Sequence, residues 1–192
     1  MNSSENGRVD HSDDGPAPLS SGSVHRLWVL FGAVVVAVVA LDQASKQWAA
    51  NNLEGRDPIN VIGTFIQFTL HFNPGAAFGT AAGYTVLLSL IAISVCVGIA
   101  FMAKRLRDPI WAISLGLFLG GALGNLIDRV FRDPGFLRGH VVDFINYNGW
   151  FVGNVADIAL TLAAIMMVVR SWQGVGVDGS SEPPAGHSHH EK

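Results

Sequence analysis

Residues 27–41 read LWVLFGAVVVAVVAL, an unbroken apolar stretch followed by DQASKQW at 42–48, over which a helix is expected to continue. Three further apolar runs lie at 83–103, 109–127 and 151–169. A membrane-spanning helix needs roughly 20 mostly apolar residues, and each run reaches or approaches that length. In lipid, the backbone of such a run satisfies its hydrogen bonds only as a helix. The sequence therefore predicts an α-helical integral membrane protein with four transmembrane helices.

The composition agrees with a membrane-embedded chain of one domain. Of the 192 residues, 49% are hydrophobic and 14% are charged, whereas a soluble domain of this length would need more charge to cover its surface. The net charge of −3 and the lack of a basic stripe give no indication of a nucleic-acid partner. The single cysteine, Cys96, excludes intrachain disulfides and multi-cysteine zinc sites.

The two ends of the chain differ in composition from its middle. Residues 1–23 are rich in Ser, Gly, Asp and Pro, and residues 173–192 also hold few large apolar side chains. Such segments bury too little surface to offset the entropy lost on ordering, so we expect two disordered tails around a membrane domain at 24–172. The first apolar run could also be the core of a cleavable signal peptide. Three later spans and a long polar leader favour a retained helix instead.

The connections between the spans are of two kinds. The link at 104–108, KRLRD, is short and basic, which is typical of a cytoplasmic loop. The segment at 59–73, INVIGTFIQFTLHFN, predicts one or two strands, with a hairpin turn at Gly63-Thr64. The link at 130–150 contains the turn signals Asp-Pro-Gly and Asn-Gly. Since Lys and Arg are shared almost equally between the two sides, it is the short basic loop that favours a cytoplasmic location for both termini.

Almost all the unusual polar residues fall on the face opposite the basic loop. With four spans, this face receives the ends of spans one and three and the starts of spans two and four. Ionisable groups at membrane depth are costly and usually face a protein interior or a water-filled cavity. Their convergence predicts a functional site at this face. The residues concerned are Asp42, Lys46, Asn73, Asn125, Asp128, Arg129, Asp143, Asn154 and Asp157.

Two aspartates stand out among these residues. Asp143 lies inside the apolar, β-like run VVDFI, a poor setting for a solvated loop carboxylate. Two carboxylates held close in a poorly hydrated site tend to share one proton, which leaves one as an acid and one as a base near neutral pH. Hydrolysis by an aspartate pair requires this division, because one carboxylate deprotonates the attacking water while the other protonates the substrate. Asp143 and Asp157 are the predicted pair.

Structural interpretations stand beside the functional one. Asp42 and Lys46 are spaced i, i+4 with the acid first, which favours a helix-end ion pair over substrate contact. Asn154 has the position of a helix N-cap, and Asp157 follows in the first turn, where the helix dipole favours an acid. This structural alternative is stronger for Asn154 than for Asp157.

Span three carries two rows of small and polar residues at i+4 spacing. One row holds Gly116, Gly120, Gly124 and Asp128, and the adjacent row holds Gly121, Asn125 and Arg129. Glycines in such a row most simply form a face for close helix packing. Asn125 and Asp128 are then interpreted as structural support, whereas Arg129 is left open between support and substrate binding.

The order of these motifs resembles one known family. From residue 27 to residue 170 the sequence is similar to lipoprotein signal peptidase, also called signal peptidase II. The resemblance rests on LDQASK at 41–46, FNPGAAFG at 72–79, GGALGNLIDR at 120–129, VVDFI at 141–145 and NVAD at 154–157. Any one block alone would be weak evidence, whereas five in the same order are specific.

The resemblance implies an aspartic endopeptidase of the bacterial inner membrane, with its active site and a small β-layer at the extracytoplasmic face. Its expected substrates are prolipoproteins that carry a diacylglyceryl group on a cysteine, cut just before that cysteine. It implies contact with membrane lipid, no metal or organic cofactor and no nucleic acid, and we expect a monomer. The catalytic pair maps onto Asp143 and Asp157, and the supporting or substrate-binding residues onto Asp42, Lys46, Asn73, Gly75, Asn125, Asp128, Arg129, Asn154 and Ala156.

The chain departs from the usual pattern of this family in two places. The family usually has an aromatic residue where this chain has Gly153, and the link from Arg129 to Asp143 is long.

A transporter with a proton relay would place ionisable groups along the depth of its spans, but the middles of all four runs lack acids and bases. A non-catalytic scaffold would tolerate Asp143→Asn with its activity unchanged.

Overall fold

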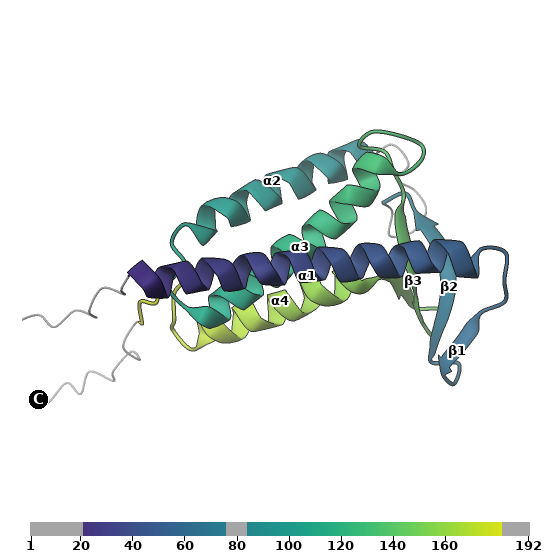
Figure 1. The fold of residues 1–192 in the computed structure, drawn as a ribbon. Coiled ribbons are helices and arrows are strands. Elements are labelled where there is room, and N and C mark those ends of the chain that lie inside the picture. Colours follow the sequence, from purple (N-terminus) through teal and green to yellow (C-terminus); the bar gives the residue numbers. More distant parts are fainter. Residues whose placement is uncertain (1–20, 76–83, 182–192) are drawn as a thin grey trace, which may run out of the picture.

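Four helices form the body of the computed structural model, which describes residues 21–75 and 84–181. They are α1 (Ser21–Leu53), α2 (Thr85–Ala103), α3 (Pro109–Phe131) and α4 (Val155–Trp172). All four are long and apolar enough to cross a membrane, and they extend in the same general direction in Figure 1. The prediction of four spans is therefore confirmed.

A small antiparallel sheet covers one end of the helices (Figure 1). Its strands are β1 (Ile59–Ile62), β2 (Ile66–Asn73), β3 (Val141–Tyr147) and β4 (Phe151–Gly153), in the order β1-β2-β3-β4. The central pairing of β2 with β3 joins the segment that follows α1 to the segment that precedes α4. This pairing is what brings two polar segments far apart in the sequence to one place.

The turns of the sheet follow from their residues. The predicted hairpin turn contains Gly63 at φ +51°, a conformation that favours glycine. The second hairpin turns at Asn148 and Gly149, whose φ values of 54° and 78° fit the turn that matches the twist of paired strands. The predicted start of the fourth span at Phe151 was wrong, because 151–153 pair with β3 and the helix begins at Val155.

The glycine row of α3 forms a close helix-packing face, as predicted, and the helix that it packs against is α1. A Cβ added to Gly116 would lie 2.9 Å from Cβ of Val34, and one added to Gly120 would lie 2.7 Å from Cβ of Val38. Both distances are too short for real side chains, so these positions allow the two backbones to approach closely. Gly121, one residue on, faces α4 instead, where an added Cβ would meet the carbonyl oxygen of Ala156 at 2.7 Å.

The segment at 173–181 differs from the disordered tail expected there. Trp111 Nε1 donates a hydrogen bond of 2.9 Å to the carbonyl oxygen of Val175, and the backbone nitrogen of Arg107 donates one of 2.9 Å to that of Val177. The Val177 side chain also packs against a buried cluster between the helices. These contacts compensate for the ordering entropy. Residues 1–20 and 182–192 of the two expected tails lie outside the described residues.

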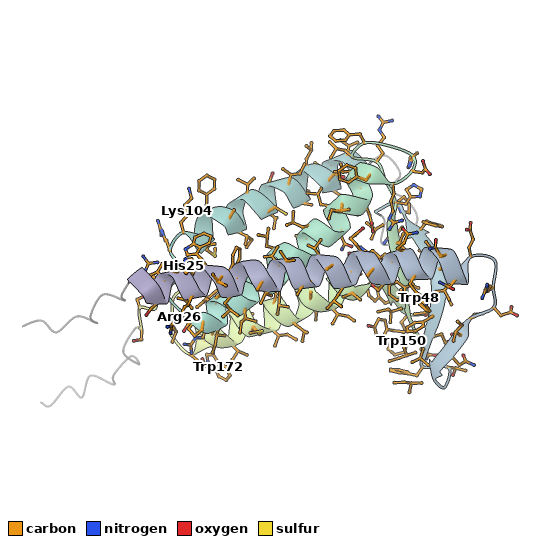
Figure 2. All side chains as sticks on the ribbon, in the orientation of Figure 1. His25, Arg26, Trp48, Lys104, Trp150 and Trp172 are labelled. Carbon is orange, nitrogen blue, oxygen red and sulfur yellow. The ribbon has the colours of Figure 1, made fainter. Side chains whose placement is uncertain are left out.

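A second buried cluster fixes the sheet to the end of α1. It consists of Ala49, Leu53, Val142 and Phe144. Trp48 adds edge-to-face contacts, with ring centroids 5.6 Å from Phe68 and 6.3 Å from Phe144, and Figure 2 shows Trp48 at the sheet end of α1. Aromatic pairs of this geometry stabilise packing beyond the area that they bury. The sheet is thereby held in a set position over the polar ends of the helices.

Candidate active site

Asp143 is the most enclosed of the predicted catalytic groups. It lies in the middle of β3 with 2% of its surface exposed. Its two carboxylate oxygens accept hydrogen bonds from two side-chain amides, at 2.8 Å from Nδ2 of Asn73 and 2.6 Å from Nδ2 of Asn154. The β2–β3 register explains the first contact, because Asn73 is diagonal to Asp143 on the same face of the sheet.

Gly75 holds the Asn73 amide in the orientation that serves Asp143. Its backbone nitrogen donates a hydrogen bond of 2.8 Å to Oδ1 of Asn73, so the amide NH₂ group turns toward the carboxylate. Gly75 has φ +103°, and a Cβ there would stand 2.7 Å from Cδ1 of Leu88 and 3.0 Å from Nη1 of Arg129. Conformation and space both require glycine at this position. Residues 76–79 of the FNPGAAFG block lie outside the described residues.

Asp157 stands at the start of α4, where it has a structural role and faces the same site. It forms a capping box with Asn154, in which each side chain accepts from the other's backbone nitrogen at 3.1 Å. Its second carboxylate oxygen accepts a hydrogen bond of 3.0 Å from Nδ2 of Asn125. The N-cap interpretation of Asn154 is therefore confirmed, but the same side chain also binds Asp143.

Asn154 thus connects the two predicted catalytic carboxylates directly. Its side-chain amide binds Asp143 and its backbone nitrogen binds Asp157. The pKa of Asp143 is raised from 3.8 to about 6, mainly by burial, with the nearby charge of Asp157 also raising it and the hydrogen bonds from Asn73 and Asn154 opposing the rise. A pKa near 6 places the protonation of Asp143 within reach of neutral pH, as a shared-proton pair requires.

Lys46 lies at the centre of a buried ionic network. Its Nζ contacts Oδ2 of Asp42 at 2.8 Å, Oδ2 of Asp128 at 2.9 Å and Oδ1 of Asn125 at 2.8 Å. An ammonium has three donors, so all three are satisfied. Because Lys46 donates to the oxygen of Asn125, the nitrogen of that amide is left to face Asp157. The predicted Asp42–Lys46 ion pair is confirmed, as part of a larger network.

The two acids of this network also tie separate elements together. Asp42 on α1 accepts a hydrogen bond of 2.9 Å from the backbone nitrogen of Ala156 on α4. Asp128 on α3 accepts one of 3.2 Å from the backbone nitrogen of Val142 on β3. Gly124 makes room for this arrangement, because a Cβ there would stand 2.5 Å from Oδ2 of Asp42. The supporting interpretation of Asp42, Asp128 and Ala156 agrees with these contacts.

Arg129 supplies a buried donor that lacks a partner within residues 21–75 and 84–181. Its Nη1 is enclosed and makes no hydrogen bond to any of the residues that the structure describes. Its charge interacts with those of Asp143, Asp128 and Asp157, but within the described chain it forms no ion pair closer than 4.0 Å. A buried guanidinium nitrogen without a partner is costly, so it is a natural binding group for an incoming acceptor.

Three residues near the site were missed by sequence reasoning. Gln43 donates to the carbonyl oxygen of Gly124 at 3.0 Å, and Arg132 pairs with Asp128 at 2.7 Å. The i, i+4 spacing of Asp128 and Arg132 was a usable signal. His71 is paired directly opposite Asp143 in the β2–β3 register. No local pattern marks Gln43 or His71, because their positions depend on the packing of α1 and the register of the sheet.

Metal binding is not indicated by the arrangement. Among the residues at 21–75 and 84–181, no three His, Cys, Asp or Glu side chains come together in a way that could hold a metal ion. The acids around Lys46 are instead neutralised by that ammonium and by Arg132. The expectation that the protein uses no metal or organic cofactor stays a prediction.

The fold and the site define a multi-pass membrane protein with two connected carboxylates buried beneath a sheet at one end of its helices. A family model described as signal peptidase (SPase) II matches residues 34–173. The chain belongs to the signal peptidase II family, and it is a peptidase that removes signal peptides from prolipoproteins.

Individual relatives agree with the family model. The chain is 43% identical to the lipoprotein signal peptidase of Rhodococcus jostii over 173 residues, 90% of this chain and 87% of the relative. It is 49% identical to that of Mycobacterium tuberculosis over 146 residues, 76% of this chain and 72% of the relative. A solved bacterial membrane enzyme has a similar structure, with a TM-score of 0.63 and 30% identity over 73% of this chain and 85% of that one.

Proposed function

We propose that Asp143 and Asp157 are the catalytic pair of this peptidase. The observation that carries the proposal is Asn154, whose side chain binds one carboxylate while its backbone binds the other. Asp143 is almost fully buried and has a pKa of about 6, so it is the better holder of the shared proton. Asp157 is only half-buried, so it is the more accessible of the two carboxylates to water. Asp157 is therefore assigned as the base and Asp143 as the acid.

The reaction follows from this assignment. Asp157 takes a proton from water as the water oxygen attacks the carbonyl carbon of the scissile peptide bond, and Asp143 gives its proton to the carbonyl oxygen. The resulting diol collapses when Asp157 passes its proton to the leaving nitrogen and Asp143 recovers a proton from a hydroxyl. The products are a carboxylic acid on the signal peptide, which then loses its proton to solvent, and a free amine, and both aspartates return to their starting states.

Arg129 is assigned to substrate binding. Its buried Nη1 lacks a partner among the described residues and lies beside Gly75, which the sheet places next to Asn73 and Asp143. A carbonyl oxygen of the bound substrate backbone would satisfy that donor. Of the two roles that the sequence left open for Arg129, these contacts favour substrate binding.

The substrate is proposed to be a prolipoprotein with a diacylglyceryl group on its cysteine, taken from the surrounding membrane by a single copy of the enzyme. The site lies at the end of helices whose outer surfaces are apolar and exposed, so hydrocarbon can reach it from the side. Nucleic acid is not expected as a partner, in keeping with the net charge of −3.

We also propose that both termini lie in the cytoplasm and that the site faces the extracytoplasmic side of the bacterial inner membrane. Figure 2 shows His25, Arg26 and Lys104 at the end of the helices opposite Trp48 and Trp150. The short basic link after α2 is at that same end, and cytoplasmic loops carry such an excess of basic residues. The peptidase domain is assigned to residues 24–172, with 173–181 packed against it.

Lipid dependence is tested with one precursor in two forms. The purified enzyme in detergent micelles is given the same precursor peptide with and without a diacylglyceryl group, and cleavage is followed by gel shift. We expect cleavage of the lipidated form alone, with a cut before the cysteine shown by mass spectrometry of the product. Equal cleavage of both forms would contradict the proposed substrate and indicate a general membrane protease.

Asn73→Ala is expected to move the pH dependence of cleavage upward. The hydrogen bond from Asn73 stabilises the ionised form of Asp143, so its loss raises the pKa of Asp143 above about 6. Because Asp143 must be protonated to act as the acid, the alkaline limb of kcat/KM shifts to higher pH, by up to about one unit for one hydrogen bond. Asn60→Ala, on the exposed strand β1, is the control and leaves the midpoint in place. A midpoint that stays or falls in the Asn73 variant would contradict the assignment.

A further inference from the structure

A cavity of about 360 Å³ adjoins Asp157. It lies between the β3–β4 hairpin and the first turns of α4. Its size falls within the range of roughly 300–1,000 Å³ in which proteins bind small organic ligands. The lining residues are Tyr147, Phe151, Gly153, Asn154, Asp157, Ile158, Thr161 and Leu162.

The Phe151 ring forms part of the cavity wall beside the Asp157 carboxylate. Phe151 and Gly153 are two residues apart on β4, so they share one face of the sheet. A Cβ on Gly153 would stand 2.6 Å from Cε1 of Phe151 and 3.0 Å from Oδ2 of Asp157. The ring therefore lies in the space that a side chain at 153 would fill. Because residue 153 has no side chain, the ring has room beside the Asp157 carboxylate.

Phe151 is also the most exposed of the apolar side chains that line the cavity. Its ring stacks on Tyr147, with centroids 6.0 Å apart and an interplanar angle of 23°. Yet 55% of its surface is exposed. A ring in this state can change rotamer at little cost in packing.

The opposite wall of the cavity belongs to a membrane-spanning helix. Ile158 and Leu162 line the cavity and are 41% and 48% exposed on the outer surface of α4. The hydroxyl of Thr161 donates to the carbonyl oxygen of Asp157 at 2.8 Å, so it adds no free polar group to this wall. The cavity is therefore apolar along α4 and continuous with the lipid-facing surface of that helix.

We propose that this cavity holds one hydrocarbon chain of the substrate's lipid group and that Phe151 determines which chains fit. The inference rests on the proposed function and adds a subsite to it. A chain already in the bilayer reaches the cavity along Ile158 and Leu162 without crossing water. A side chain of the substrate peptide, in contrast, would have to extend from the substrate backbone at Asp157 toward the lipid to enter the cavity. Phe151 sets the width of the cavity, because its ring occupies the space beside Gly153 and Asp157 and is half-exposed.

The first test varies the chain and the peptide separately. Purified wild type, Phe151→Ala and Phe151→Leu are given lipopeptides whose acyl chains are straight or methyl-branched, at equal carbon number. A second series keeps the straight chain and varies the apolar residue before the cleaved bond. Phe151→Ala is expected to raise the branched-to-straight ratio of kcat/KM by about tenfold, with a smaller rise for Phe151→Leu, and to leave the peptide-series ratios unchanged. Trp150→Ala, on the same hairpin but outside the cavity, is the matched control and keeps wild-type ratios in both series.

Each other outcome overturns the inference. Unchanged acyl ratios would show that Phe151 does not set the width, and changed peptide-series ratios would place a side chain in the cavity. If Phe151→Ala fails to fold, Phe151→Leu carries the same comparison, because it keeps an apolar side chain. Wild-type cleavage of the straight-chain substrate establishes the proposed function independently, so failure of the subsite is distinguishable from failure of that function.

A double-mutant cycle tests the position of the ring without reference to lipid. Gly153→Ala is expected to lower kcat/KM by about tenfold, because the added Cβ meets the Phe151 ring and crowds Asp157. Phe151→Ala in the same background is expected to recover part of that loss, since it removes the closer of the two contacts. Purely additive effects would show that the ring does not lie over residue 153, and the proposed wall would be wrong.

Discussion

Asp143→Asn and Asp157→Asn are each expected to reduce cleavage of a lipidated precursor by roughly a thousandfold or more, the largest effect expected of any substitution in this chain. An asparagine can neither take the proton of the attacking water nor return one to the substrate, so either change removes half of the acid–base pair. The measurement is single-turnover cleavage by purified variants in micelles. Asp57→Asn, an exposed aspartate before β1, is the control and cleaves at the wild-type rate.

Both variants are expected to fold. In Asp143→Asn the new NH₂ group faces one of two amides whose orientations are fixed, that of Asn73 by Gly75 and that of Asn154 by Asp157. One hydrogen bond is lost, which costs about 1 kcal/mol of the free energy of unfolding. That cost is opposed by the removal of a charge that burial disfavours. Full cleavage by either folded variant would refute the catalytic assignment.

The pH dependence of stability gives an independent check on Asp143. Its pKa is raised in the folded state from 3.8 to about 6, so the native protein binds the proton more tightly than the unfolded chain. The stabilisation is complete below about pH 4 and is lost as the pH rises through 6, with a maximum of about 3 kcal/mol. Tm in detergent should therefore fall over this range in the wild type. In Asp143→Asn the part of the fall in Tm that is due to Asp143 is expected to be absent. A variant whose Tm depends on pH as in the wild type would contradict the raised pKa of Asp143.

Lys46→Met is expected to cost about 3–5 kcal/mol of the free energy of unfolding, the largest loss of stability expected here. The Lys46, Asp42 and Asp128 side chains are all 0% exposed, so removal of the ammonium leaves Asp42 without its cationic partner inside the protein. Asp128 keeps its pairing with Arg132 at 2.7 Å. Methionine preserves most of the length of lysine, so the loss reports on charge rather than on a cavity.

A second variant separates charge from packing at this position. Adding Asp42→Asn to Lys46→Met removes the uncompensated carboxylate and is expected to recover a large part of the stability. Cleavage is not expected to recover, because the oxygen of Asn125 loses its 2.8 Å hydrogen bond from Lys46 and keeps only the longer one, of 3.3 Å from Asn154, to orient its amide toward Asp157. Lys104→Met, on the exposed basic link, controls for the loss of a positive charge. Thermal unfolding of Lys46→Met within about 1 kcal/mol of wild type would contradict the network.

Much of the framework was predictable because it depends on local patterns. Apolar length alone located the helices, and β-branched residues around Gly63 predicted the first hairpin. The i+4 glycine row of α3 predicted a close helix contact, and the structure places it against α1. The start of the fourth span was wrong because Phe151–Gly153 are apolar and suit either a helix or a strand. Only pairing with β3 decides between them.

The sequence by itself determined the number of spans, the face on which the polar residues gather and the acids available for catalysis. Each of these depends on the chemistry and spacing of residues within one segment. The tertiary structure alone decided that Asn154 joins both aspartates, that Lys46 turns the Asn125 amide toward Asp157, and that the Phe151 ring occupies the space above Gly153. Hydrogen bonds and side-chain contacts act over about 3–4 Å. Which atoms meet at that range depends on how distant segments pack, and a local pattern does not contain that information.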